Sequence, residues 1–269
     1  MKMRMSLKPN TNQLNRAINV DSVAGLKLWL LATDVNQIRE ADNSTVENAD
    51  LVKQWSDSSG ENNNFIQASS NRQPRYINSD SQGPLLVFDG SETLSTTDRM
   101  SCLSTITAGD FTLFSVLDLS NSSPQDEMFI SELGNTNSRI SLMQGNDADR
   151  IQIRFDDGVT EEICDLEDLS QNIPTDRFLL TVRRDSSTQN NIHVKFNGVD
   201  VTDLSDIDTG TDANNDSAGI DFVFDTIGVG GANSLEYQGS ICEIVFYSVA
   251  LGDLTVSRLE KDIMSRNGI

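Results

Sequence analysis

The sequence contains few of the side chains on which most enzymes and metal sites depend. Among its 269 residues there is one histidine, His193, and there are three widely spaced cysteines, Cys102, Cys164 and Cys242. One histidine and scattered cysteines cannot assemble an ordinary zinc site. An odd number of distant cysteines predicts buried free thiols rather than a disulfide framework. There is also no G-x-S-x-G motif, which disfavours a serine hydrolase of that type.

Basic side chains are scarce as well, with 20 Lys and Arg against 41 Asp and Glu and a formal net charge of −21. Nucleic acids and anionic membranes bind clustered Lys and Arg, so the composition argues against both as partners. No apolar run approaches the length of a membrane-spanning helix. The N-terminal segment lacks the apolar core of a secretory signal. We therefore expect synthesis in a reducing cytosol.

The N-terminus carries charge of the opposite sign to the rest of the chain. Residues 1–20 hold four bases and no acid, which leaves −25 for the remaining residues. A basic arm on an acidic body is suited to docking on a neighbouring copy or another acidic partner, although a disordered terminus has the same composition. We expect an arm over residues 1–24 and one domain over 25–269. The docking residues of the arm would be Lys2, Arg4, Lys8 and Arg16.

Hydrophobic side chains recur with a period of two, which is typical of strands. In "IQIRF" (151–155), for example, Ile151, Ile153 and Phe155 share one face. Short strands between polar turns predict an all-β, two-sheet antiparallel jelly-roll sandwich. The pair Asn197-Gly198 supplies the positive φ angles of a type I′ hairpin turn. The expected strands are Leu26–Leu31, Leu85–Phe88, Phe111–Leu117, Met128–Leu133, Ile151–Phe155, Phe178–Arg183, Ile192–Phe196 and Ile241–Tyr247.

The C-terminal segment follows a helical pattern instead. Val256, Leu259 and Ile263 form an apolar stripe at helical spacing. Asp253 is the expected N-cap, and Gly268 stands where a helix is commonly terminated. We expect a short helix that closes one end of the sandwich.

Several segments resemble concanavalin A-like domains of the laminin-G type. They are "GLKLWLLATD", "VKQWSDSSG", "RQPRYINSDSQGPLLVFDGSETLST", "FTLFSVL" and the closing "YQGSICEIVFYSVALGDLTVSRLEKDI". The resemblance runs from about residue 25 to the C-terminus and is loose over 120–225. It implies a two-sheet antiparallel jelly roll. The same sandwich serves lectins, adhesion modules, glycosidases and virion components, so it implies function much less than fold.

The stretch "VKQWSDSSG" has two interpretations. Trp55 beside Asp57 in a polar loop is compatible with a sugar-binding platform. Alternatively, Trp55 is buried at a strand end and Asp57 holds an Asx-type turn. The resemblance implies a structural corner, and the pattern of the flanking residues favours the same interpretation. For Trp29, in a strand that is apolar on both faces, we likewise expect a packing role.

The stretch "EEICDLED" is the candidate catalytic segment. Glycosidases on this fold place carboxylates at alternate strand positions, but Glu162, Asp165 and Glu167 are spaced by three and two. Strand periodicity puts Glu162 on the opposite face from the other two, unless a β-bulge at Cys164 restores the parity. Without that bulge the carboxyls cannot flank one glycosidic bond as a retaining mechanism requires. We therefore expect no enzyme activity.

Calcium is the candidate cofactor. Asp206, Asp208 and Asp212 surround Gly210 with a spacing similar to that of calcium loops, although the full loop pattern is missing. A solvated acidic loop has the same composition. Asp89, in a Phe-Asp-Gly turn, is expected to be structural.

The sequence thus predicts a non-catalytic virion structural protein of a bacteriophage: a decoration, fibre or tail-associated sandwich anchored by its arm. The expected partners are other virion subunits or further copies in an oligomer or lattice, and host cell-surface glycans. The alternative is a carbohydrate-binding or adhesion module of a bacterial surface protein, which would be located at the cell surface or outside the cell. A glycoside hydrolase is a third hypothesis and depends on the bulge.

Overall fold

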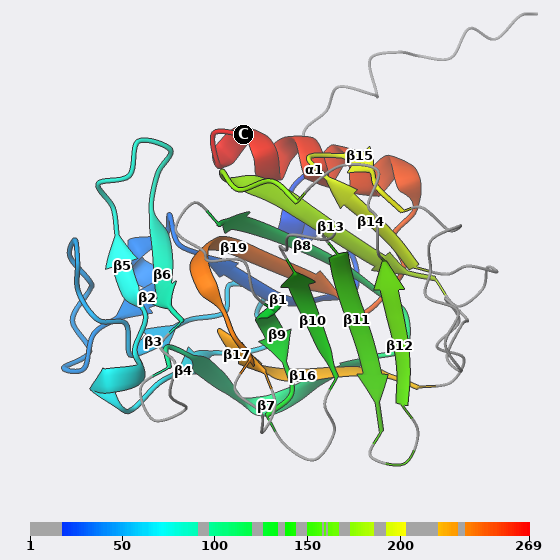
Figure 1. Cartoon of the computed structure of the whole chain (residues 1–269). Helices are drawn as coiled ribbons and strands as arrows, with labels where there is room; N and C mark the ends of the chain where they lie inside the picture. Colours follow the sequence, from blue (N-terminus) through cyan, green and yellow to red (C-terminus); the bar gives the residue numbers. More distant parts are fainter. Residues whose placement is uncertain are drawn as a thin grey trace, which may run out of the picture.

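The computed structural model describes residues 18–90, 97–119, 126–133, 138–143, 150–157, 159, 161–166, 173–185, 192–202, 220–230 and 235–269. Within these ranges two antiparallel sheets face each other in a jelly-roll sandwich, with a helix outside (Figure 1). None of the helices in these ranges has both the length and the apolar character needed to cross a membrane.

The first sheet contains the long C-terminal strand β19 (Gln238–Tyr247) beside β8 (Phe111–Asp118). Along its other edge, the N-terminal part of β19 pairs with β6 and the C-terminal part pairs with β1. Strand order beyond β8 continues through β13 and β14 to β15. The remaining strands of this sheet are β1 (Leu26–Leu31), β5 (Arg75–Ile77), β6 (Leu85–Asp89), β13 (Phe178–Arg184), β14 (Ile192–Phe196) and β15 (Val199–Asp200).

The second sheet has the order β12-β11-β10-β9-β16-β7-β4-β3-β2. Its strands are β2 (Ile38–Arg39), β3 (Gln54–Trp55), β4 (Phe65–Ile66), β7 (Met100–Ala108), β9 (Asp126–Ser131), β10 (Arg139–Met143), β11 (Arg150–Asp156), β12 (Glu161–Leu166) and β16 (Phe222–Ile227). A separate pair joins β17 (Val229–Gly230) to β18 (Leu235–Glu236). Short 3-10 turns occupy Val20–Ser22, Val35–Gln37 and Ser70–Arg72.

The main core lies between the two sheets. Phe111 and Phe246 from the first sheet meet Phe222 and Phe224 from the second, with ring centroids 5.0 to 5.5 Å apart. Such ring pairs contribute specific geometry in addition to the area they bury. The predicted alternation in β11 is confirmed, because Ile151, Ile153 and Phe155 belong to this core.

A second apolar cluster lies on the outer face of the first sheet, beneath the helix α1 (Asp253–Arg266) (Figure 1). The predicted stripe of Val256, Leu259 and Ile263 is buried there. Residues 18–23 pack beside it, and the Tyr247 hydroxyl donates to the Val20 carbonyl (2.8 Å). The first sheet is therefore covered on both faces, and any site on its outer face has to lie beside the helix.

The C-terminal end of α1 is fixed by a buried carboxylate. Glu243, 0% exposed in the middle of β19, accepts hydrogen bonds from the Arg266 Nε (2.9 Å), the Asn267 Nδ2 (2.7 Å) and the Trp29 Nε1 (2.9 Å). The Arg266 guanidinium also lies over the Trp29 ring, 5.7 Å from its centroid. Trp29 is thus a packing residue, as expected from the sequence.

The helix begins differently from the prediction. The N-cap residue is Gly252, which makes no side-chain cap, so the assignment of Asp253 as N-cap was wrong. Asp253 is the first helical residue, and its carboxylate pairs with Arg183 of β13 instead. An ion pair to a distant strand replaces the local capping bond. At the other end Gly268 has φ +72°, so the predicted glycine termination is confirmed.

Candidate functional site

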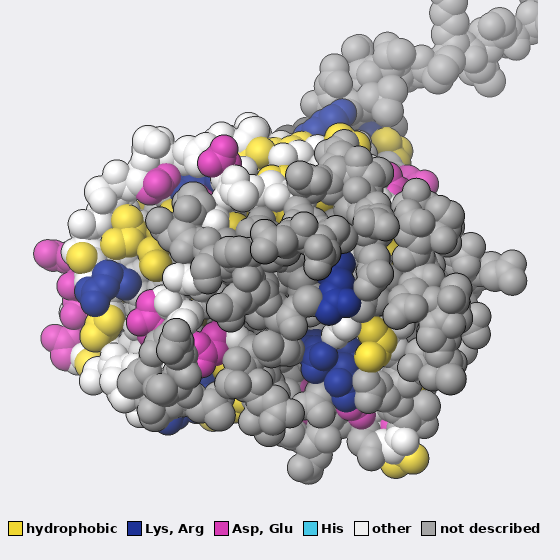
Figure 2. Space-filling view, viewed as in Figure 1, with side chains coloured by type: hydrophobic (Ala, Val, Ile, Leu, Met, Phe, Trp, Pro, Cys, Tyr) yellow, Lys and Arg dark blue, Asp and Glu magenta, His cyan; other side chains and the backbone are white. Residues whose placement is uncertain are grey.

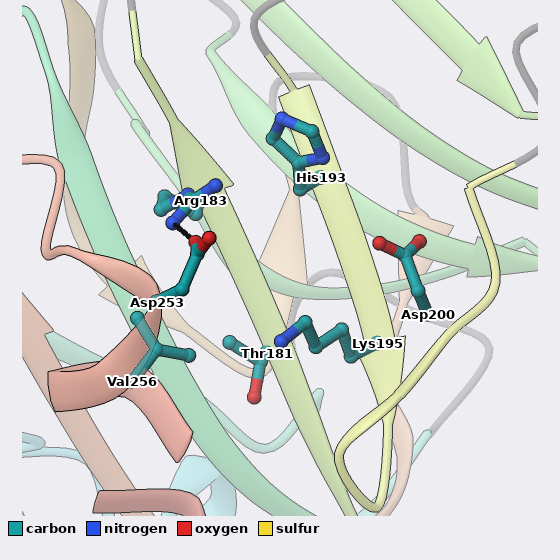
Figure 3. A pocket seen from close by; sticks show the side chains of 7 residues that line it. All are labelled: Thr181, Arg183, His193, Lys195, Asp200, Asp253 and Val256. Atoms are coloured by element: carbon teal, nitrogen blue, oxygen red, sulfur yellow. Dashed lines mark hydrogen bonds and ion pairs between the residues drawn. The ribbon is translucent and has the colours of Figure 1, made fainter. Parts of the chain in front are cut away.

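A cavity of about 180 Å³ lies on the outer face of the first sheet, beside the start of α1 (Figure 3). We call it the helix-end cavity. Its walls come from β13, β14, β15 and the first turn of the helix. The described residues that line it are Thr181, Arg183, His193, Lys195, Asp200, Asp253 and Val256.

Strand periodicity explains why these side chains meet. In β13 the core residues Leu180 and Val182 alternate with outward positions, and β14 alternates in the same way. The register pairs Thr181 with Lys195 and Arg183 with His193. Side chains opposite each other on one face of a sheet are close neighbours. The two strands therefore place four polar side chains next to one another on the face that bears the helix.

An ion pair forms one wall. The Arg183 guanidinium donates to the Asp253 carboxylate and to the Leu251 carbonyl (3.0 Å). The hydrogen bond and charge of Arg183 lower the pKa of Asp253 below its ordinary value. This contact joins the first residue of α1 to β13 across 70 positions of sequence.

His193 of β14 lines the cavity beside Arg183, its register partner on β13 (Figure 3). Burial, and then the charge of Arg183, lower its pKa from the ordinary 6.5. The imidazole is therefore mainly neutral at pH 7, and a neutral imidazole offers one hydrogen-bond donor and one acceptor. The alternation of β14 places His193 on the opposite face from the buried Ile192, Val194 and Phe196. The cavity around it was not predicted from the sequence.

The inner end of the cavity contains polar groups with incomplete hydrogen bonding. Thr181 is 1% exposed, and its Oγ1 has no hydrogen-bond partner among the described residues. Lys195 extends toward Thr181 (Figure 3), and its Nζ lies 3.8 Å from the Glu260 Oε1. That buried oxygen also lacks a hydrogen bond within the described part of the chain. Buried polar groups in folded proteins normally form hydrogen bonds, so these two oxygen atoms are exceptions.

A second cavity, of about 370 Å³, lies at the edge formed by β5 and β6. Its walls include the apolar Ile77 and Val87 together with Asp89 and Asp98. Asp98 is 8% exposed, and its Oδ2 accepts a hydrogen bond from the Asp89 backbone N–H (3.2 Å). Burial, and then the nearby charge of Asp89, raise the pKa of Asp98 to about 7. Asp98 is thus a partly protonated acid at neutral pH.

Basic side chains gather in front of β10 and β11 in the space-filling view (Figure 2). Arg139, Arg150 and Arg154 occupy outward positions on these strands, and the register places Arg139 directly opposite Arg154. Both make contacts with their neighbours: Arg154 pairs with Asp156 (3.0 Å), and Arg139 donates to Gln152 (2.8 Å). These contacts give the arginines a structural role on this face.

The structural interpretation of "VKQWSDSSG" is confirmed. Trp55 is 0% exposed in the main core. Asp57 accepts hydrogen bonds from the backbone N–H groups of Trp29 (2.9 Å), Ser59 (2.8 Å) and Asn63 (3.0 Å). The carboxylate therefore joins this turn to β1 and is not available as a sugar ligand.

The candidate catalytic strand pairs with β11 without a register shift, from Ile151↔Leu166 to Asp156↔Glu161. The bulge that the glycosidase hypothesis needs at Cys164 does not occur in this pairing. Glu162 stands opposite Phe155 and Asp165 opposite Gln152, so the two positions belong to opposite faces. Glu167 lies outside the described residues.

The other predicted site residues also lie outside the described ranges. They are the calcium candidates Asp206, Asp208 and Asp212 and the arm residues Lys2, Arg4, Lys8 and Arg16. In the part of the chain that the structure does describe, no group of three or more His, Cys, Asp or Glu side chains could hold a metal ion. Cys102, Cys164 and Cys242 are buried thiols that belong to no disulfide, as predicted.

Comparisons with known proteins support the fold. No protein-family model and no curated protein matches the sequence. Among solved structures, the binding domain of Paraclostridial Mosquitocidal Protein 1 is 13% identical with a TM-score of 0.53, covering 91% of this chain and 53% of that chain. Domain 4 of an extracellular arabinanase from Geobacillus stearothermophilus, in complex with arabinotriose, is 18% identical (TM-score 0.48; 80% and 100% covered). A pentraxin from Limulus polyphemus is 10% identical (TM-score 0.48; 64% and 78% covered). The likeness shows the two-sheet jelly-roll fold.

Proposed function

We propose that this protein is a non-catalytic carbohydrate-binding module whose ligand occupies the helix-end cavity. The observation that carries the proposal is the set of polar groups around that cavity, including the Thr181 hydroxyl, which has no hydrogen-bond partner among the described residues. A sugar presents hydroxyl groups that both donate and accept hydrogen bonds. The cavity offers donors on Arg183 and Lys195, acceptors on Asp200, and both on Thr181 and His193.

The position of these groups supports recognition rather than reaction. They project mainly from two paired strands of a sheet, which hold side chains more precisely than loops do. Glycoside hydrolysis requires two carboxyl groups, one protonated to act as the acid and one ionised to act as the base or nucleophile. The carboxylate of Asp253 is held by Arg183, which leaves it poorly suited to act as an acid.

The fold agrees with this proposal but does not identify a ligand. The mosquitocidal protein's domain is described as a binding domain, and its likeness extends over 91% of this chain. At 13% identity that likeness supports the sandwich alone. The choice of carbohydrate rests on the chemistry of the cavity and on the sequence resemblance to concanavalin A-like domains.

The virion hypothesis remains a prediction from sequence. It rests on the basic N-terminal segment, and it concerns the larger structure to which the module is attached. A carbohydrate-binding sandwich could serve a particle or a cell surface equally well. The two alternatives therefore make different predictions about the arm and the same prediction about the cavity.

The test is binding of the purified protein to a broad bacterial glycan array, first with calcium and then with EDTA. We expect binding that falls about tenfold in Lys195→Met, the change produced by losing one charged hydrogen bond. The matched control is Lys27→Met, because Lys27 forms a comparable but exposed ion pair with Glu61 (3.1 Å). Silence of the wild-type protein under both conditions would refute the proposal, and loss of binding in EDTA would move the site to a calcium loop.

A further inference from the structure

We infer that the helix-end cavity accepts one uncharged sugar ring, the terminal residue of a glycan, and holds it through the Thr181 hydroxyl and the Lys195 ammonium. This inference rests on the proposed function and specifies the ligand class and its inner contacts. The contacts involve the protein's own side chains and require no metal ion.

The first argument is the Thr181 hydroxyl. It is buried, it lines the cavity, and no described residue partners its Oγ1. A buried hydroxyl without a partner destabilises the fold, whereas a valine of the same shape would not. A polar group placed at such a cost is expected where a ligand completes its hydrogen bond.

The second argument is the neighbouring ion pair. The Lys195 Nζ is 3.8 Å from the Glu260 Oε1, beyond hydrogen-bond distance, and that oxygen has no hydrogen bond to the described residues. An ammonium carries three donors. The register places Lys195 directly opposite Thr181, so adjacent hydroxyls of one ring can contact both side chains.

The third argument concerns charge and size. The described charged side chains that line the cavity are the bases Arg183 and Lys195 and the acids Asp200 and Asp253, while His193 is mainly neutral at pH 7. Because these charges balance, the lining provides no net positive charge to attract an acidic sugar, and an uncharged sugar fits it better. The volume of about 180 Å³ is below the roughly 300 Å³ at which sites for drug-sized ligands begin.

The described lining also contains no Phe, Tyr or Trp. Long glycans are usually held on such aromatic platforms, because each ring covers a large apolar area. A small polar cavity without a platform suits the end of a chain rather than its middle. These features together favour a single neutral ring.

The experiment compares two variants, each of which lacks one buried hydroxyl that has no partner among the described residues. Thr181→Val removes the hydroxyl in the cavity. Ser115→Ala removes another buried and unpartnered hydroxyl, on the adjacent strand β8, which does not line the cavity. Both variants are expected to keep or raise the wild-type Tm. Thr181→Ser, which restores a hydroxyl, is the rescue variant.

Affinity is measured for the full chain by titrating neutral hexoses, uronic acids and amino sugars, with amide chemical shifts as the readout. We expect neutral hexoses to shift the amides of residues 181, 193 and 195, in EDTA as well as in calcium. Thr181→Val should weaken binding about tenfold, Thr181→Ser should restore most of it, and Ser115→Ala should leave it unchanged.

Each outcome separates the inference from the proposed function. If the wild-type protein binds no sugar or glycan, the proposed function fails and the inference fails with it. If sugars bind but Thr181→Val has wild-type affinity, or if only uronic acids bind, the inference is refuted and the proposed function stands.

Discussion

Replacing Asp98 with asparagine should make the protein more stable at pH 8 and leave its stability almost unchanged near pH 4. Asp98 is buried against the β6 end, and its pKa is raised to about 7 by burial and by the charge of Asp89. Asparagine has the same shape and cannot ionise. Its side-chain oxygen can still accept the hydrogen bond from the Asp89 N–H that Asp98 accepts at 3.2 Å.

The magnitude follows from the two pKa values of Asp98. Below the unfolded value of 3.8 both states are protonated, and above about 7 both are ionised. Between them the folded state retains a proton that the unfolded state has lost, so the free energy of unfolding falls as pH rises through this window. A shift of one pKa unit corresponds to about 1.4 kcal/mol, so about three units give roughly 4 kcal/mol. Because the carboxyl borders an open cavity, solvent screening reduces this to about 2–4 kcal/mol.

The assay is urea denaturation of the wild-type protein and of Asp98→Asn at half-unit steps from pH 4 to pH 8. The stability difference between the two should be small at pH 4 and grow toward pH 7, then level off. Ser115→Ala is the control, because it removes a hydroxyl that does not ionise between pH 4 and pH 8, so its stability difference should not change with pH. A difference for Asp98→Asn that is constant across the range would refute the reasoning.

Three further predictions concern the helix, a glycine and the arm. Glu243→Ala should destabilise the fold by about 3 kcal/mol, since it leaves Arg266 without its buried partner; a loss below about 1 kcal/mol in denaturation would contradict the role given to this carboxylate. Gly228→Ala should lower Tm sharply, because φ is +90° and an added Cβ would lie 2.5 Å from the Phe88 ring; Gly252→Ala, with open space around it, is the control. Deleting residues 1–17 leaves Val20 in its buried place and should preserve Tm while reducing salt-sensitive self-association in sedimentation experiments. Equal association of both forms would argue against a docking arm.

The strands, the hairpin and the helix were predictable because each depends on local rules. Period-two patterns located β1 and β14 at their observed bounds, and β11 to within a residue at each end. Asn197 and Gly198 have φ +50° and +78°, as the predicted hairpin turn requires. The Asp57 turn was also foreseeable, since an aspartate followed by Ser-Ser-Gly forms side-chain-to-backbone bonds within a few residues.

The candidate site was less accessible from sequence. Strand periodicity separates the inward from the outward side chains of β13 and β14, but the cavity forms because the start of α1 lies beside these strands. That placement depends on Arg183 pairing with Asp253 and on Glu243 holding the helix end, contacts that span 70 and 23 positions of sequence. Asp253 was assigned to the helix cap because only its local neighbours were considered.

What the sequence determined by itself is therefore the sandwich, its turns and the inward or outward direction of most side chains, since these follow from neighbours along the chain. The tertiary structure determines which outward side chains share a cavity, which carboxyl has a raised pKa and which hydroxyls are buried without a partner among the described residues. Thr181 and Asp98 look ordinary in the sequence. Their properties arise from desolvation and from groups brought close by folding, and neither is encoded in local spacing.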